Sequence, residues 1–110
     1  MIRPLTPEAA ELIARRFQAL SDPTRLRILD TLRDRDQVSV SELTEALQTS
    51  QQNVSKHLAA LQAEGYVSRR KEKTRSLYRI SDPAVHELCE SVCSGIEAQL
   101  AQLGAALSAR

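Results

Sequence analysis

The chain has 110 residues, 42% of them apolar and 26% charged, and its formal net charge is +1. This length suits a single domain, and because no linker or low-complexity stretch interrupts it, we treat residues 1–110 as one unit. No run approaches the ~18 apolar residues of a membrane span, and the start lacks a secretory signal. Two cysteines without such a signal indicate free thiols in a reducing compartment, so we expect a cytoplasmic protein with no membrane partner.

Two helices are predicted in the first third of the chain by the same start signal. Thr6 and Asp22 are each followed by a proline, which places a capping side chain before a residue suited to the first helical turn. The first helix is expected to run to about residue 20, and the second to end near residues 33–36. Their apolar stripes are Ala9, Ile13, Phe17 and Leu20 in the first helix, and Leu26, Leu29 and Leu32 in the second.

Two shorter helices are predicted next. Ser39 and Glu42 have the spacing of a capping box, which begins a helix that buries Leu43 and Leu47. After a turn at residues 48–49, Ser50 (or Thr49) caps a fourth helix. It carries Val54, Leu58 and Leu61 at helical spacing and is expected to stop at Gly65.

The last third predicts a hairpin and a long helix. Residues 66–71 and 75–80 have the pattern of two strands joined by a turn at 72–74, and a last helix is expected over about residues 83–107. Its apolar stripe is Val85, Leu88, Val92, Ile96, Leu100, Leu103 and Leu107. This stripe is longer than the core of so small a chain can cover, which favours a partner helix that packs against it. The fold class is therefore mainly α with a small β-hairpin, in the order of four helices, two strands and a helix.

Charge is distributed unevenly along this pattern. Residues 66–80 hold six Lys or Arg against one acid, whereas residues 81–100 hold four acids and no Lys or Arg. Such asymmetry suits a protein with one end facing a polyanion. No acid–base or nucleophile pair forms a recognisable catalytic motif, so we do not expect an enzyme.

The fourth helix and the hairpin together have the layout of a DNA-reading device. A helix in the major groove needs short polar side chains near its N-terminus, and Gln or Asn can pair with adenine through two hydrogen bonds. The hairpin can lie along the phosphates or enter a minor groove. The candidate DNA-binding residues are Ser50, Gln51, Gln52, Asn53, Ser55 and Lys56 on the helix and Arg69, Lys71, Lys73 and Arg75 on the hairpin. A solvated helix face and a purely structural hairpin are the alternatives, and His57 is expected to pack or to face a phosphate.

The chain resembles the ArsR/SmtB-type bacterial winged-helix repressors from about residue 10 to residue 100. The resemblance is carried by FQALSDPTRLRILDTL (17–32), SELTEAL (41–47), SQQNVSKHLAALQAEGYVSRR (50–70) and YRIS (78–81). It implies a winged helix-turn-helix, a homodimer through the first and last helices, and an operator of double-stranded DNA that is an imperfect palindrome. It also implies repression relieved by a ligand that lowers DNA affinity.

Both metal sites common in that family are missing. Ser39 and Ser41 stand where many members have two cysteines at the start of the third helix, and a serine hydroxyl does not replace a soft thiolate. In the family's other site, on the last helix, Asp82 matches the first ligand position, but Ala84 and Gly95 stand where histidines are expected.

Cys89 and Cys93 remain as candidate ligands, one helical turn apart on the last helix. Their Cβ atoms should lie about 5–6 Å apart, and a tetrahedral metal with ~2.3 Å bonds to sulfur needs sulfurs only ~3.8 Å apart. An intrahelical disulfide is harder, because it needs Cβ atoms within about 4.5 Å. No resident cofactor is expected. Arsenic(III) or antimony(III), bound by thiols across a dimer, is the expected inducer, with zinc or cadmium and His86 as a further ligand the less favoured choice.

Several alternatives stay open at this point. Free cysteines often pack as small hydrophobes, and both of these lie in or beside the apolar stripe. The pair can also serve as a redox or persulfide switch, or the repressor can lack cysteine sensing altogether. A winged-helix module used for protein contacts or DNA architecture is the alternative from a different functional class.

Overall fold

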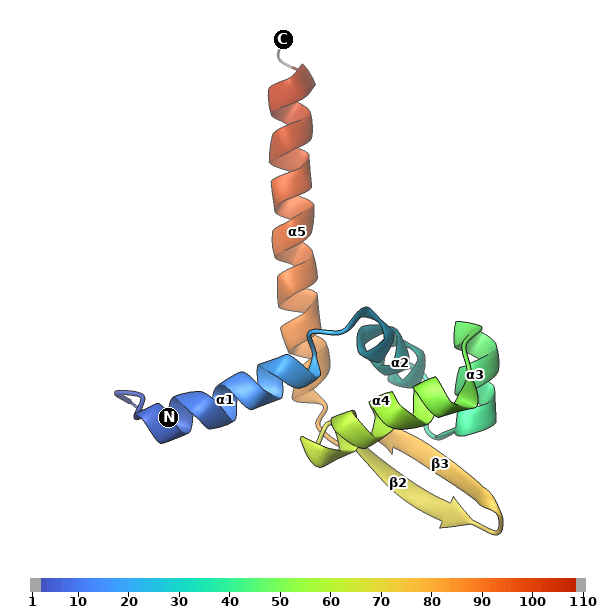
Figure 1. The fold of residues 1–110 in the computed structure, drawn as a ribbon. Helices are drawn as coiled ribbons and strands as arrows, with labels where there is room; N and C mark the ends of the chain where they lie inside the picture. Colours follow the sequence, from blue (N-terminus) through green and yellow to red (C-terminus); the bar gives the residue numbers. More distant parts are fainter. Residues whose placement is uncertain (1–2, 109–110) are drawn as a thin grey trace.

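The computed structural model describes residues 3–108, which form five helices and three strands. In chain order these are α1 (Pro7–Ala19), α2 (Pro23–Arg33), β1 (Val38–Ser39), α3 (Val40–Leu47), α4 (Gln51–Ala63), β2 (Val67–Glu72), β3 (Arg75–Ile80) and α5 (Ala84–Ser108). Figure 1 shows α2, α3, α4 and the β2–β3 hairpin gathered into one body, while α1 leaves it on one side and α5 projects from it as a single rod. This is the predicted winged helix-turn-helix order, with β1 added.

The helix starts lie where the capping signals predicted them. The side chains of Thr6, Asp22, Ser39 and Ser50 each accept a hydrogen bond from a backbone N–H of the first turn of α1, α2, α3 and α4. The capping box at α3 is complete, since Glu42 also accepts from the backbone N–H of Ser39 at 3.3 Å. Gly65 follows the end of α4 with φ +78°, the left-handed conformation that glycine adopts without strain.

The sheet has three antiparallel strands in the order β1-β3-β2. The prediction missed β1, in which Val38 and Ser39 pair with Tyr78 and Leu77 of β3. A strand of two residues is too short to show an alternating pattern, and Ser39 carries a helix-cap signal at the same time. The β2–β3 pairing runs to Glu72 opposite Arg75, so the hairpin turn is one residue tighter than predicted.

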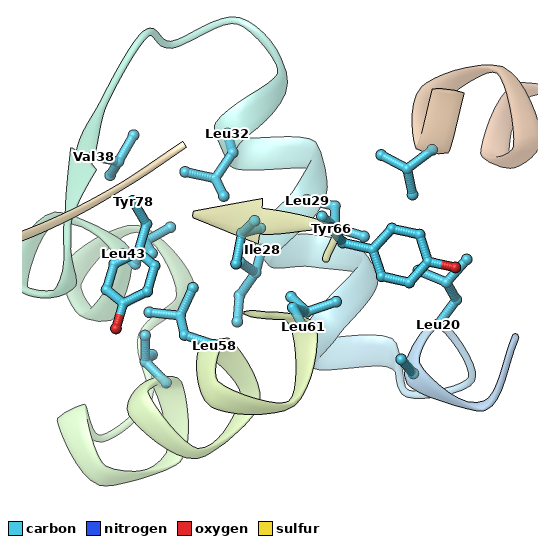
Figure 2. Packing of buried hydrophobic residues seen from close by; sticks show 14 of the residues in the cluster. Leu20, Ile28, Leu29, Leu32, Val38, Leu43, Leu58, Leu61, Tyr66 and Tyr78 are labelled. Atoms are coloured by element: carbon cyan, nitrogen blue, oxygen red, sulfur yellow. The ribbon is translucent and has the colours of Figure 1, made fainter. Parts of the chain in front are cut away.

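The core lies between α2, α3, α4 and the sheet. Figure 2 shows Ile28 of α2 beside Leu58 and Leu61 of α4, and all three are fully buried. The predicted apolar face of Leu26, Leu29 and Leu32 is buried only in part, because the Leu26 side chain is 41% exposed and Ile28 lies in the interior instead. A helix turns 100° per residue, so a stripe of Ile28, Leu29 and Leu32 faces inward and leaves Leu26 on the flank beside α5.

The apolar stripes of α1 and α5 are mostly uncovered within one chain. In α5 only Val85 is buried, and Leu88 and Cys89 pack partly against the core. The remaining stripe residues are between 51% and 62% exposed; they are Val92, Ile96, Leu100, Leu103 and Leu107. Ile13 and Phe17 of α1 are exposed as well. Apolar stripes of this length that stay exposed mark an interaction surface. No helix within residues 3–108 is both long and apolar enough to cross a membrane.

Candidate nucleic-acid interface and thiol pair

The first turns of α4 present polar side chains on a rigidly anchored helix. Gln51, Gln52, Ser55 and Lys56 are exposed, as the predicted reading face requires. Gln52, Ser55 and Lys56 point away from Val54, Leu58 and Leu61, which are fully buried in the core, while Gln51 is exposed because it begins the helix. Because the buried side holds the helix against α2 and the sheet, the exposed side is presented at a set angle to any groove it enters.

Two of the predicted reading residues serve the start of α4 itself. The Ser50 hydroxyl accepts a hydrogen bond from the Asn53 N–H at 3.0 Å. The Asn53 side-chain amide donates to the Thr49 hydroxyl at 3.1 Å, and Asn53 is half-buried. These contacts fix the turn that leads into α4: Ser50 is exposed beside the four residues and caps the helix, whereas Asn53 is half-buried behind them.

The hairpin uses its arginines and its lysines differently. Arg69 donates to the Ser76 hydroxyl across the strands at 3.2 Å, and Arg75 makes an ion pair with Glu42 of α3 at 3.2 Å. Within residues 3–108 the side chains of Lys71 and Lys73 make no hydrogen bond or ion pair, and both are exposed. The arginines therefore brace the ribbon, and the lysines near its tip are the cations most available to a phosphate.

His57 packs behind the reading face rather than on it. Its ring is buried, the Arg25 Nε donates to its Nδ1 at 3.0 Å, and its Nε2 lies 3.8 Å from the Asp22 carboxylate. Asp22 and Arg25 belong to the start of α2, so His57 ties that helix to α4. Its expected packing role is confirmed, whereas Arg25 was missed. The sequence signal that could have pointed to Arg25 was the histidine itself, because a buried ring nitrogen needs a hydrogen-bond partner.

The fold is expected to lose stability as pH falls below the ordinary histidine pKa of 6.5. Burial lowers the pKa of His57, and although the Asp22 charge opposes this, the Lys56 and Arg25 charges reinforce it. The folded state therefore binds a proton at His57 less readily than the unfolded state, and the stabilisation present above pH 6.5 fades below it. Urea midpoints at about pH 7.5 and about pH 5.5 should differ in the native chain, and less in His57→Gln. An equal drop in the variant would contradict this origin.

The two cysteines line one apolar groove. It has a volume of about 420 Å³ and lies between α5 and the end of α1 and start of α2, with Phe17, Leu26 and Val92 in its walls. Cys89 is half-buried, Cys93 is exposed, and neither forms a disulfide. The predicted pair is therefore brought together on one side of α5, next to its exposed stripe.

The pKa values of both thiols are raised above that of an ordinary cysteine. Burial raises the pKa of Cys89. A hydrogen bond with Glu97, at 3.5 Å, and the charge of that carboxylate raise the pKa of Cys93. Among residues 3–108 no three His, Cys, Asp or Glu side chains lie close enough to hold one metal ion, so His86 does not complete a site with the two thiols within one chain.

The residues at the two other family positions have structural partners. Ser39 caps α3 and is buried, so its hydroxyl is already used. Asp82 accepts hydrogen bonds from the Ala84 N–H at 3.1 Å and from the Arg16 guanidinium at 2.7 Å. These contacts already engage the Ser39 hydroxyl and both oxygens of the Asp82 carboxylate within the chain.

Comparison with known proteins places this geometry among DNA-binding regulators. A family model described as a helix-turn-helix domain matches residues 20–65. An uncharacterised HTH-type transcriptional regulator of Methanocaldococcus jannaschii, MJ1325, is 38% identical over 85 residues, which are 77% of this chain and 96% of that protein.

Two solved structures are similar over most of their length. One is Mb0332 of Mycobacterium bovis, a homodimeric winged helix-turn-helix DNA-binding domain described as a possible ArsR-family regulator. It has a TM-score of 0.74, is 29% identical, and the match covers 90% of this chain and 94% of that one. The other is AntR, an antimony-specific transcriptional repressor, with a TM-score of 0.75, 28% identity and 90% of both chains covered.

Proposed function

This chain belongs to the ArsR/SmtB family of winged helix-turn-helix transcriptional regulators, and from that premise we propose that it is a dimeric repressor released from its operator by a thiophilic metalloid. Arsenic(III) or antimony(III) would bind Cys89 and Cys93 of α5. The observation that carries the proposal is the position of both thiols in one groove, beside an apolar stripe that a single chain leaves exposed.

DNA binding rests on α4 and the wing formed by β2 and β3. Four exposed polar residues of α4 can reach base edges, and Lys71 and Lys73 extend the contact to the phosphates. The basic wing favours DNA over a module used only for protein contacts. The relatives support this assignment, since the whole match with Mb0332 is to a DNA-binding domain.

Dimerisation rests on α1 and α5. A second copy that covers the exposed stripe residues would remove apolar surface from water at about 25 cal/mol per Å². Two-fold symmetry would also present two copies of α4 to half-sites about one DNA turn apart, which accounts for an imperfect palindrome as the operator. The homodimeric state of Mb0332 supports this arrangement.

The chemistry of the thiols favours a metalloid over a redox reaction. Both thiol pKa values are raised in the free chain, so few thiolates are present to attack an oxidant or a persulfide. Arsenic(III) or antimony(III) instead arrives as a neutral hydroxide: each metalloid–sulfur bond forms as a metalloid–oxygen bond breaks, and the thiol proton leaves with that hydroxide as water, so no free thiolate is needed beforehand. Two α5 helices supply up to four thiols, enough for a centre that takes three. The similarity to an antimony-specific repressor points the same way.

Release from DNA then follows from linkage. A ligand that binds the thiols of one dimer geometry better than those of another shifts the equilibrium toward that geometry. If the favoured geometry misplaces the two α4 helices relative to their half-sites, operator affinity falls. A coupling of ~1–3 kcal/mol corresponds to a five- to 150-fold loss of affinity.

The direct experiment titrates the operator complex of the full chain with a panel of compounds. The operator is first selected from random DNA, and the complex is then exposed to antimonite, arsenite, cadmium or polysulfide in a mobility-shift assay. Release by antimonite or arsenite supports the proposal. Release by polysulfide alone overturns it in favour of a thiol-modification switch, and release by none of the four assigns the chain to repressors without cysteine sensing.

Removing the lysines of the wing is expected to flatten the salt dependence of operator binding. Each phosphate that no longer meets a lysine should reduce the slope of log affinity against log salt by about 0.9, so Lys71→Ala with Lys73→Ala, which removes four lysines from the dimer, should reduce it by about 3.6. Operator titrations from low to moderate salt measure the slope. Arg15→Ala removes a cation from α1 and is the matched control; a double variant with the native slope would show that the wing does not contact DNA.

A further inference from the structure

Arg16 of α1 binds the ends of two other helices with one guanidinium group. Its Nη1 donates to the backbone carbonyl of Glu64 at 2.6 Å, and its Nη2 donates to the Asp82 carboxylate at 2.7 Å. The guanidinium carbon lies 4.5 Å from the centre of the Tyr66 ring, a cation–π distance. The Tyr66 hydroxyl in turn donates to the backbone carbonyl of Arg16 at 3.0 Å.

The partners of Arg16 lie at the end of α4 and just before the start of α5. Glu64 caps the C-terminal end of α4, where the last helical carbonyls lack partners within the helix. Asp82 precedes α5 and accepts a hydrogen bond from the Ala84 N–H at its start. The Arg16 side chain therefore joins the helix that carries the reading face to the helix that carries the thiols, and its own backbone adds α1.

Few other contacts fix α1 and α5 against the body. Ala9 and Ala19 are the buried residues of α1, and Val85 is the buried residue of α5. The two helices also face each other across a cavity of about 310 Å³, whose lining includes Arg16, Asp82 and Val85. Because so little apolar surface is buried there, the orientation of α1 and α5 relative to α4 depends on charge-assisted hydrogen bonds, which require good geometry.

We propose that Arg16 is the positioning residue that couples the α1 and α5 helices to the reading helix α4. With the guanidinium bound to Glu64 and Asp82, a change in the packing of α5 displaces the end of α4 and so alters the spacing of the two reading helices in a dimer. One part of this proposal, that inducer binding at the thiols acts through Arg16, rests on the proposed function. The role of Arg16 in setting the spacing rests only on the operator-bound dimer of that function and not on its inducer.

Arg16→Met tests the coupling, because methionine keeps an apolar side chain of comparable length and removes both donors and the charge. Arg33→Met is the matched control. Arg33 is the last residue of α2 and forms an ion pair with Glu90 of α5, so it joins α5 to α2 rather than to α4. Arg16→Lys retains the charge on a single ammonium group, and its effect should lie between those of the native arginine and of Arg16→Met. Thermal melts identify any variant that fails to fold, in which case Arg16→Lys carries the test.

The first readout needs no inducer. Native protein is expected to bind the selected operator about tenfold or more tightly than a version with one base pair inserted between the half-sites, because losing simultaneous engagement of the second half-site costs up to 10²–10⁴ in affinity. Arg16→Met should shrink this ratio toward one, while Arg33→Met keeps it. An unchanged ratio in Arg16→Met overturns the proposal.

The second readout separates this proposal from the proposed function. The native ratio of operator affinities without and with antimonite, five- to 150-fold, should fall toward one in Arg16→Met. Antimonite binding to the DNA-free variant, followed by ultraviolet absorption of the metalloid–thiolate bonds, should match the native protein. A native chain that antimonite does not release refutes the proposed inducer, and the spacing ratio still decides the role of Arg16. A variant released as readily as the native chain refutes the coupling route through Arg16.

Discussion

Ile96→Lys combined with Leu100→Lys is expected to convert the dimer to monomers and to weaken operator binding by about 10²–10⁴. Both side chains lie in the exposed stripe of α5, at 51% and 62% exposure. In the proposed dimer they meet the partner helix, where two lysines per chain would place like charges together in an apolar seam at high cost. A monomer engages one half-site at a time and loses the gain from simultaneous binding.

Sedimentation equilibrium at micromolar concentration measures the first effect, and operator titration measures the second. Ser94→Lys with Ala98→Lys is the matched control, because it adds two lysines with the same spacing on the opposite side of α5. The control should stay dimeric and bind the operator. A stripe variant that remains a dimer with native affinity would exclude α5 as the dimer interface.

Cys89→Ser and Cys93→Ser, each alone, are expected to abolish release by antimonite, so that a native five- to 150-fold loss of operator affinity falls to about one. Each substitution leaves two thiols in a dimer where a trivalent metalloid favours three, and a serine hydroxyl is not a soft ligand. Cys93 is exposed, so Cys93→Ser should leave folding and operator affinity intact. It is the cleaner of the two tests, since Cys89 also packs against the core.

The same titration with Ser91→Ala controls for substitution on α5 with both thiols intact. A pH series adds an independent readout. Because both thiol pKa values are raised above their usual 9.0, the thiols stay protonated near neutral pH, and each proton leaves with one hydroxide of the neutral metalloid hydroxide as water. Antimonite affinity should therefore change little between about pH 6 and about pH 8, whereas cadmium binding, which releases protons, should strengthen as pH rises. Serine variants that still leave the operator on adding antimonite would assign the two cysteines to packing alone.

The sequence by itself determined those features that depend on neighbours along the chain. Caps at Thr6, Asp22, Ser39 and Ser50 act within one turn, so the helix starts could be predicted from residues two or three apart. The period of Val54, Leu58 and Leu61 likewise showed which side of α4 is buried, and therefore that Gln52, Ser55 and Lys56 are presented outward. The cation-rich hairpin was visible for the same reason.

Only the tertiary structure decided the features that join distant segments. Strand β1 exists because β3 lies beside it, and the choice of Ile28 over Leu26 for the core depends on where α4 crosses α2. Arg16 meets Glu64 and Asp82 across 48 and 66 residues, and no local pattern distinguishes it from the exposed Arg15 beside it. DNA binding could thus be predicted from local periodicity and charge. The link between the thiols and the reading helix was not, because a guanidinium finds its acceptors only after the chain has folded.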